Sequence, residues 1–166
     1  MKIKVAVLTL SDKGARGERK DVGGEILKEI VEKRLKGEIS FYEILPDEKE
    51  LIKKKMIELS EKGVDLILTT GGTGGTPRDV TPEATLEVIE KRFQGMEILM
   101  MIEGLKITPF ASLSRAVVGS RRGTLIINLP GNRWAVKENL LPLIPVIPHL
   151  LREIKGQSEE CEDLRK

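Results

Sequence analysis

Residues 69–83 read Thr-Thr-Gly-Gly-Thr-Gly-Gly-Thr-Pro-Arg-Asp-Val-Thr-Pro-Glu, and they directly follow the apolar residues 66–68. Four glycines in five positions let the backbone turn tightly and come close to a ligand. Their N–H groups, together with the N-terminus of a following helix, favour a bound anion. The stretch therefore predicts a buried strand that leads into an anion-binding loop.

Asp79 places a carboxylate beside this anion site. Because a carboxylate repels a phosphate unless a cation lies between them, the combination indicates a phosphorylated ligand with a hard metal ion such as Mg²⁺. The loop lacks the Gly-Lys-Ser/Thr ending of a P-loop and the Gly-x-Gly-x-x-Gly spacing of a dinucleotide site. The glycines alone would also fit a purely structural turn.

Strand and helix patterns alternate on both sides of this stretch. Runs of apolar residues predict strands at 3–10, 39–45, 66–70 and 124–129. Helical periodicity and capping signals predict helices at 21–35, 48–60, 81–93 and 96–105, and a C-terminal helix within 137–154. In the helix at 81–93, Thr81 is expected as the N-cap and Pro82 as the first helical residue. The alternation predicts an α/β three-layer sandwich with a mainly parallel sheet and helices on both faces.

Ligands of such sheets bind outside the carboxyl ends of the strands. The loops expected there span residues 11–21, 46–47, 69–79 and 128–132, and each carries polar, Gly or Pro residues. Their convergence is a stronger argument for a site than any one loop. Residues 1–155 are expected to form a single domain, followed by a polar tail at 156–166.

The composition limits the function classes. The net charge of +2 is too small for a dedicated nucleic-acid reader or a membrane-surface protein. No apolar run reaches the roughly 20 residues that span a bilayer. We therefore expect no nucleic-acid partner, no membrane and a cytoplasmic location. A single histidine, His149, and a single cysteine, Cys161, exclude an internal Cys/His zinc cluster and an intrachain disulfide.

The amino-acid usage is typical of a heat-adapted protein. Charged residues make up 33% of the chain, whereas Gln occurs twice and Asn three times. Ion-pair networks gain value at high temperature, and amide side chains are thermolabile. Ordinary drift in a small protein is the alternative explanation.

A second carboxylate, Asp47, follows Pro46 at the end of another predicted strand. Asp47 and Asp79 together would hold one Mg²⁺ through oxygen atoms and waters. Asp47 would alternatively serve as an acidic residue at the start of the helix at 48–60, and on position alone the two readings are about equal. The corresponding alternative for Asp79, a cap before Thr81, is weaker.

Several other polar segments have weaker signals. Ser11-Asp12 follows the first strand, in a segment that reads by itself as an ordinary polar loop. Ser114-Arg115 and Arg121-Arg122 are candidate phosphate contacts, although Arg121-Arg122 lies between glycines and fits a solvated turn better. Residues 128–132 either present amides to a polar ring or simply end a strand. Trp134 is either a packing residue or a lid over a ring.

These residues resemble the molybdopterin adenylyltransferase family of molybdenum-cofactor biosynthesis, whose domains also occur in plant and animal molybdenum-insertion proteins. The resemblance runs from about Val5 to Gly156. The matching segments are Leu-Thr-Leu-Ser-Asp at 8–12, Asp21, Pro-Asp-Glu at 46–48, Thr-Thr-Gly-Gly-Thr-Gly at 69–74, Pro-Arg-Asp-Val-Thr-Pro-Glu-Ala-Thr at 77–85, Lys-Ile-Thr-Pro-Phe-Ala at 106–111, Leu-Ser-Arg at 113–115 and Asn-Leu-Pro-Gly-Asn at 128–132.

The resemblance implies the molybdenum cofactor biosynthesis protein fold and a homotrimer, whose contacts we expect from apolar residues such as those at 96–101. It also implies a Mg²⁺- and ATP-dependent reaction that converts molybdopterin into adenylylated molybdopterin and releases pyrophosphate, with a molybdenum-insertion protein as a further partner. Asp47 and Asp79 would be the catalytic and metal-binding carboxylates, and Ser11 and Asp12 would face the nucleotide. The implied substrate-binding residues are Thr70, Gly71, Gly72, Thr73, Gly74, Ser114, Asn128, Pro130 and Gly131.

One segment departs from the family pattern. After Asn132 the family usually continues with proline or a small residue, whereas this chain has Arg133-Trp134. The mouth of the pterin pocket is therefore expected to differ. The intact Arg-Asp-Val-Thr-Pro segment favours the adenylyltransferase branch over a close relative with a similar fold.

Two other functions stay open at this point. A non-catalytic carrier or scaffold would bind molybdopterin without ATP turnover, and a nucleotide-binding regulatory module would bind nucleotide without the pterin. The paired carboxylates favour the enzyme, because a plain anion binder gains nothing from added negative charge.

Overall fold

The computed structural model describes residues 2–157. A six-stranded sheet with the order β2-β1-β3-β6-β5-β4 forms its centre. The strands are β1 Lys4–Leu10, β2 Glu38–Leu45, β3 Leu66–Thr70, β4 Lys91–Arg92, β5 Val118–Arg121 and β6 Thr124–Leu129. The pairs β1–β2, β1–β3 and β3–β6 are parallel, and the pairs β5–β6 and β4–β5 are antiparallel.

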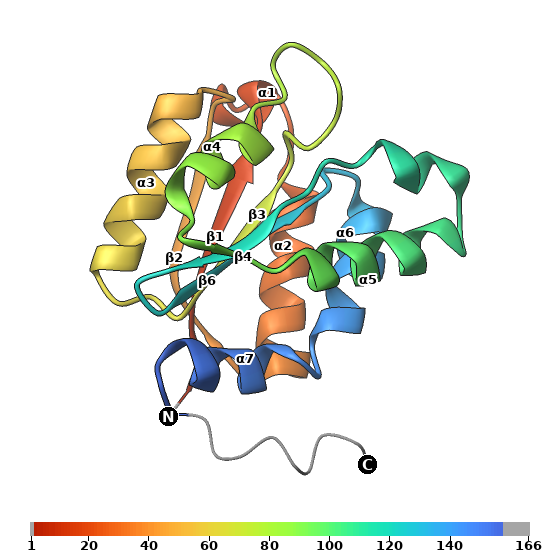
Figure 1. The fold of residues 1–166 in the computed structure, drawn as a ribbon. Coiled ribbons are helices and arrows are strands. Elements are labelled where there is room, and N and C mark those ends of the chain that lie inside the picture. Colours follow the sequence, from red (N-terminus) through yellow and green to blue (C-terminus); the bar gives the residue numbers. More distant parts are fainter. Residues whose placement is uncertain (1, 158–166) are drawn as a thin grey trace.

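Helices cover both faces of the sheet (Figure 1). The α-helices are α1 Asp12–Ala15, α2 Val22–Ile30, α3 Lys49–Glu61, α4 Thr81–Val88, α5 Gln94–Leu105, α6 Arg133–Leu140 and α7 Ile147–Ile154. A π-helical turn η1 spans Val31–Leu35, and two 3₁₀ turns span Pro109–Leu113 (η2) and Leu141–Leu143 (η3). The predicted three-layer α/β sandwich is confirmed.

Two apolar cores lie on opposite faces of the sheet, because successive side chains of a strand point in opposite directions. On one face, Val5 and Val7 of β1 belong to a core that includes residues of α2, α5, α6 and α7. On the other face, Ala6 and Leu8 pack in a core with residues of α3 and α4. A parallel strand buried on both faces requires the near-continuous apolar run that the sequence shows.

The predicted strands at 3–10, 39–45, 66–70 and 124–129 agree with β1, β2, β3 and β6 to within one residue. The helix predicted at 81–93 is too long, since α4 ends at Val88. Residues 91–92 instead form the edge strand β4, and the neighbouring N–H groups of Glu90 and Phe93 donate to carbonyls of β5. The partner strand β5 was not predicted, because its Val-Gly-Ser-Arg sequence has no strand-like alternation.

Three further details differ from the predictions. Thr81 is not the N-cap of α4, since Val80 occupies that position and Thr81 already lies in the helix. The C-terminal helical region begins with α6 at Arg133, where the side chain of Asn132 accepts hydrogen bonds from two helical N–H groups. Met96 and Met100, expected as inter-subunit contacts, are buried in this chain's own core.

Among residues 2–157, no helix combines the length and apolar character needed to cross a membrane. The predicted polar tail and Cys161 lie mostly or wholly beyond this range, and only Gly156 and Gln157 of the tail belong to it.

Candidate active site

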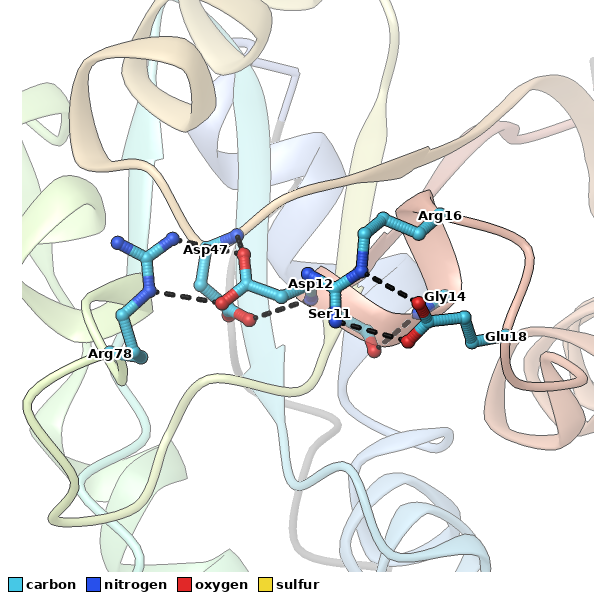
Figure 2. Close-up of polar contacts among 7 residues, drawn as sticks. All are labelled: Ser11, Asp12, Gly14, Arg16, Glu18, Asp47 and Arg78. Carbon is cyan, nitrogen blue, oxygen red and sulfur yellow. Dashed lines mark hydrogen bonds and ion pairs between the residues drawn. The ribbon is translucent and has the colours of Figure 1, made fainter.

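The loops that follow β1, β2, β3 and β6 meet at one end of the sheet, as the parallel order requires. The first two loops are joined by a reciprocal pair of hydrogen bonds. The N–H of Asp12 donates to Asp47 Oδ2 at 3.0 Å, and the N–H of Asp47 donates to Asp12 Oδ1 at 3.0 Å. Figure 2 shows the two carboxylates side by side with Arg78. Asp47 is thus held by Asp12, the first residue of α1, and does not cap α3.

Arg78 connects the glycine-rich loop to this pair. Its Nε and Nη2 atoms each donate to the carboxylate of Asp12 at 2.9 Å (Figure 2). The hydrogen bonds from Arg78, and then the one from the Asp47 backbone, lower the pKa of Asp12 below its ordinary value. Both oxygens of Asp12 are therefore occupied. Asp12 holds Asp47 in place, and its implied contact with a nucleotide stays a prediction.

The carboxylate of Asp47 has fewer hydrogen-bond partners than that of Asp12. Its Oδ1 atom is buried and has no hydrogen-bond partner among the described residues. Burial, together with the negative charges of Asp12 and Asp79, raises the pKa of Asp47 above its ordinary value. A buried anionic oxygen without a donor is suited to a cation.

We expect Asp47→Asn to stabilise the metal-free protein at neutral pH. Because the folded-state pKa is raised, the charged carboxylate costs stability once the pH exceeds the unfolded-state value of 3.8. The amide removes that cost and keeps an acceptor for the Asp12 N–H. Urea denaturation with a chelator should show the gain at pH 7 and its loss near pH 3; an equal gain at both would contradict the assignment.

The glycine-rich loop lies directly against both carboxylates. A Cβ added at Gly72 would lie 3.1 Å from Asp47 Oδ1, and one added at Gly74 would lie 2.9 Å from Asp79 Oδ2. Asp79 also accepts a hydrogen bond from the Thr76 N–H at 2.9 Å, so it folds back over the loop and does not cap α4. The loop thus brings Asp47 and Asp79 to one place although they follow different strands.

Buried polar side chains bind the backbone of the glycine-rich loop and the elements that flank it. Thr81 Oγ1 donates to the Gly71 carbonyl at 3.0 Å. Asn128 is fully buried; its Nδ2 atom donates to Thr69 and Thr85 Oγ1, and its Oδ1 atom accepts from the Val117 N–H. Asn128 therefore joins β6 to β3 and α4, the elements on either side of the loop. It lines neither of the two cavities beside the carboxylates, and its implied contact with the substrate stays a prediction.

Arg115 binds the backbone of the glycine-rich loop from the segment that follows η2. Its guanidinium donates to the carbonyls of Gly74 and Asp79, at 2.8 and 3.0 Å, and pairs with Glu83. Because these partners occupy Arg115, the idea that it neutralises phosphate is not supported. Arg122 lies in the tight turn between β5 and β6, as the sequence suggested.

Two cavities flank the carboxylates and share the residues Gly72, Asp79 and Gly131 as a common wall. The larger, of about 1090 Å³, has a mostly apolar lining and contains Thr73, Gly74, Ser114 and Pro130. The smaller, of about 490 Å³, contains Ser11, Asp47, Thr70 and Gly71. Apart from Asp12 and Asn128, all predicted site residues line one or both of these two cavities.

Three residues of the cavities were named from the sequence without being assigned to the site: Asp21 and Phe110 only as parts of family matches, and Trp134 as either a packing residue or a lid. In the smaller cavity, Asp21 accepts hydrogen bonds from Thr9 Oγ1 at 2.6 Å, from the Gly24 N–H at 2.9 Å and from the Tyr42 hydroxyl. The larger cavity has two strongly exposed aromatic residues, Phe110 and Trp134, which are 76% and 64% exposed. Of the two alternatives for Trp134, its exposure at the cavity wall favours the lid over the packing residue.

The donor set fits a Mg²⁺ ion that is held only partly by the protein. Residues 2–157 contain no group of three or more His, Cys, Asp or Glu side chains arranged around one ion. Asp47 and Asp79 therefore offer two hard oxygen ligands, which suits Mg²⁺ shared with substrate phosphates and waters.

Comparison with known proteins gives a consistent result. The family model described as "Probable molybdopterin binding domain" matches residues 6–149. A molybdopterin adenylyltransferase from Helicobacter pylori J99 is 41% identical over 156 residues, covering 93% of this chain and 89% of the relative. Gephyrin from Dictyostelium discoideum is 44% identical over 162 residues, covering 92% of this chain, which spans only 23% of gephyrin.

The fold is also that of a solved relative. The crystal structure of the molybdopterin biosynthesis enzyme MoaB from Thermus thermophilus superposes with a TM-score of 0.87 at 44% identity, covering 95% of this chain and 99% of the other. The chain therefore belongs to the molybdopterin-binding domain family that includes the molybdopterin adenylyltransferases.

Proposed function

We propose that this protein adenylylates molybdopterin in a Mg²⁺- and ATP-dependent reaction. The observation that carries the proposal is the position of Asp47 and Asp79. Both carboxylates lie against a glycine-rich loop, where a large, mostly apolar cavity meets a smaller one that contains Asp47. The larger cavity suits a flat pterin, and the carboxylates suit a metal-bound polyphosphate.

In the proposed reaction, an oxygen of the molybdopterin phosphate forms a bond to the α-phosphorus of ATP. The bond between that phosphorus and the oxygen bridging to the β-phosphate breaks, and pyrophosphate leaves with the electron pair. A phosphate nucleophile is already anionic at neutral pH, so no side chain needs to remove a proton. Catalysis then depends on positioning and on neutralisation of charge.

Each part of the site has a role in this scheme. Backbone N–H groups of residues 72–74 orient phosphate oxygens, whereas the Gly71 N–H already donates to the Leu129 carbonyl. Ser114, Pro130 and Gly131 shape the pterin side. Asp47 and Asp79 would hold Mg²⁺, which when bound neutralises phosphate charge and aligns the triphosphate. Asp12 and Arg78 keep Asp47 in position.

The family resemblance extends the proposal to assembly and location. We infer a cytoplasmic homotrimer that passes its product to a molybdenum-insertion protein. In support of an assembly, α5 and η2 expose apolar residues that the chain itself leaves uncovered, including Ile98 at 57% and Leu113 at 65% exposure. Fusion of related domains into the longer gephyrin chain is consistent with such a partner.

Pyrophosphate release from ATP and Mg²⁺, measured with and without molybdopterin, tests the proposed function. We expect release that requires molybdopterin and stops when a chelator removes Mg²⁺. Tight binding of molybdopterin without any release of pyrophosphate would instead establish the carrier function. ATP binding without affinity for molybdopterin would favour a regulatory module.

A further inference from the structure

The smaller cavity contains cations that its carboxylates do not neutralise. Arg19, Lys20 and Arg133 line it together with Asp47 and Asp79. Lys20 lies 3.8 Å from Glu25, an exposed pair that contributes little. Among residues 2–157, Arg19 and Arg133 have no carboxylate within salt-bridge distance. Two guanidinium groups thus share a cavity with two carboxylates without pairing to them.

The third carboxylate of this cavity, Asp21, does not require these arginines either. Its oxygens already accept hydrogen bonds from Thr9, Tyr42 and the Gly24 N–H. The arginines are therefore not explained by the charge balance of the folded protein. Arginines that stay unpaired at a cavity wall are suited to an anionic ligand, because the planar guanidinium donates to two oxygens at once.

Arg133 stands at the boundary between the two cavities. It is the first residue of α6 and lines the smaller cavity, whereas its neighbour Trp134 lines the larger one. The guanidinium carbon of Arg133 lies 4.8 Å from the centre of the Trp134 ring, a cation–π distance that limits its freedom. Arg19 reaches the same cavity from the loop that precedes α2.

We propose that Arg19 and Arg133 bind the β- and γ-phosphates of ATP and hold the pyrophosphate as it leaves. This inference rests on the proposed function, and it assigns the polyphosphate to the smaller cavity. The triphosphate then lies between the metal-binding carboxylates and the two arginines. That arrangement turns the α-phosphorus toward the shared wall, where the molybdopterin phosphate arrives, and places the departing negative charge beside the guanidinium groups.

AMP is the informative comparison ligand, because it carries the adenosine and the α-phosphate but lacks the phosphates that the arginines would bind. Isothermal titration calorimetry should compare pyrophosphate with Mg²⁺, ATP with Mg²⁺, and AMP. We expect Arg19→Ala and Arg133→Ala each to weaken pyrophosphate and ATP binding by about tenfold or more, and to change AMP binding by less than about twofold.

Two further variants serve as controls. Arg133→Lys keeps a point charge but not the planar fork, so its affinity for pyrophosphate should lie between those of the wild type and Arg133→Ala. Arg152→Ala removes an exposed arginine from α7, which lies at the opposite end of the sheet from the loops (Figure 1), and should change none of the affinities.

Different binding results would contradict the role of the two arginines and the proposed adenylylation. Unchanged pyrophosphate affinity in both alanine variants, or equal losses for AMP and pyrophosphate, would overturn the inference even if the wild type adenylylates molybdopterin. A wild type that binds pyrophosphate through these arginines but never releases it from ATP and molybdopterin would overturn only the proposed function. A wild type without affinity for either ATP or pyrophosphate would overturn both.

Discussion

Asp79→Asn is expected to reduce molybdopterin-dependent pyrophosphate release by at least about 100-fold, the usual loss when a charge-stabilising group is removed from an active site. The carboxylate lies against Gly74 on the wall that both cavities share, where the proposed metal ion and the α-phosphate meet. The amide keeps an oxygen to accept the Thr76 N–H but loses the charge that holds Mg²⁺. The rate of pyrophosphate release at saturating ATP measures this effect.

Two comparisons make the result specific to the site. Glu61→Gln removes one negative charge from the exposed C-terminal end of α3 and should leave the rate unchanged. Asp47→Asn should lose activity as Asp79→Asn does, although we expect it to gain stability in the metal-free protein. Near-wild-type turnover of Asp79→Asn, with the fold intact by thermal unfolding, would remove Asp79 from the metal-binding role.

Gly71→Ala is expected to lower the free energy of unfolding by about 3–5 kcal/mol, since it adds backbone strain to a steric clash. The φ angle of Gly71 is +99°, a region that side chains disfavour, and an added Cβ would lie 2.3 Å from the Leu10 carbonyl oxygen. The backbone of β1 cannot yield easily, because the Leu10 side chain is buried in the core. Urea denaturation measures the loss, which corresponds to a fall in Tm of about 2–4 °C per kcal/mol.

Two other glycines separate the causes of this loss. Gly63 also has a positive φ, of +75°, but has nothing within 4 Å of an added Cβ, so Gly63→Ala measures the backbone strain alone, about 1–2 kcal/mol. Gly75 has neither a positive φ nor a close neighbour, and Gly75→Ala should be nearly neutral. Equal losses at positions 71 and 63 would show that Gly71 does not lie close to the Leu10 carbonyl of β1.

The central sheet was largely predictable from the sequence. Residues 5–10, 66–70 and 124–129 are buried on both faces of the sheet, so their sequences are mostly apolar and the strands can be recognised from local composition. The antiparallel edge of the sheet, formed by β5 and β4, was not predictable from local composition. The residues of β4 and β5 carry no local strand pattern, and pairing between the two segments, more than 20 residues apart in sequence, makes them strands.

In the candidate site, too, some features follow from the local sequence and others only from tertiary contacts. The sequence by itself determined the glycine-rich loop, the carboxylates Asp47 and Asp79 and the family, since residue type, spacing and motif order are local properties. Only the tertiary structure decided which groups are already occupied. Arg78 pairs with Asp12 across 66 residues, and Arg115 binds the loop across 41, so both guanidinium groups already have partners within the protein.

The same distinction applies to the residues that remain available for a ligand. The local sequence marked Arg133 only as part of a departure from the family pattern, and it did not separate Arg19 from the other arginines. Asn128 has the same amide whether it lines a pocket or lies beneath a loop. Hydrogen-bond partners, burial and the division of the site into two cavities depend on which loops converge at the end of the sheet. The sequence therefore determined the chemical groups of the site, and the fold decided which of them support the loop and which face a ligand, because partners and burial come from contacts between distant segments.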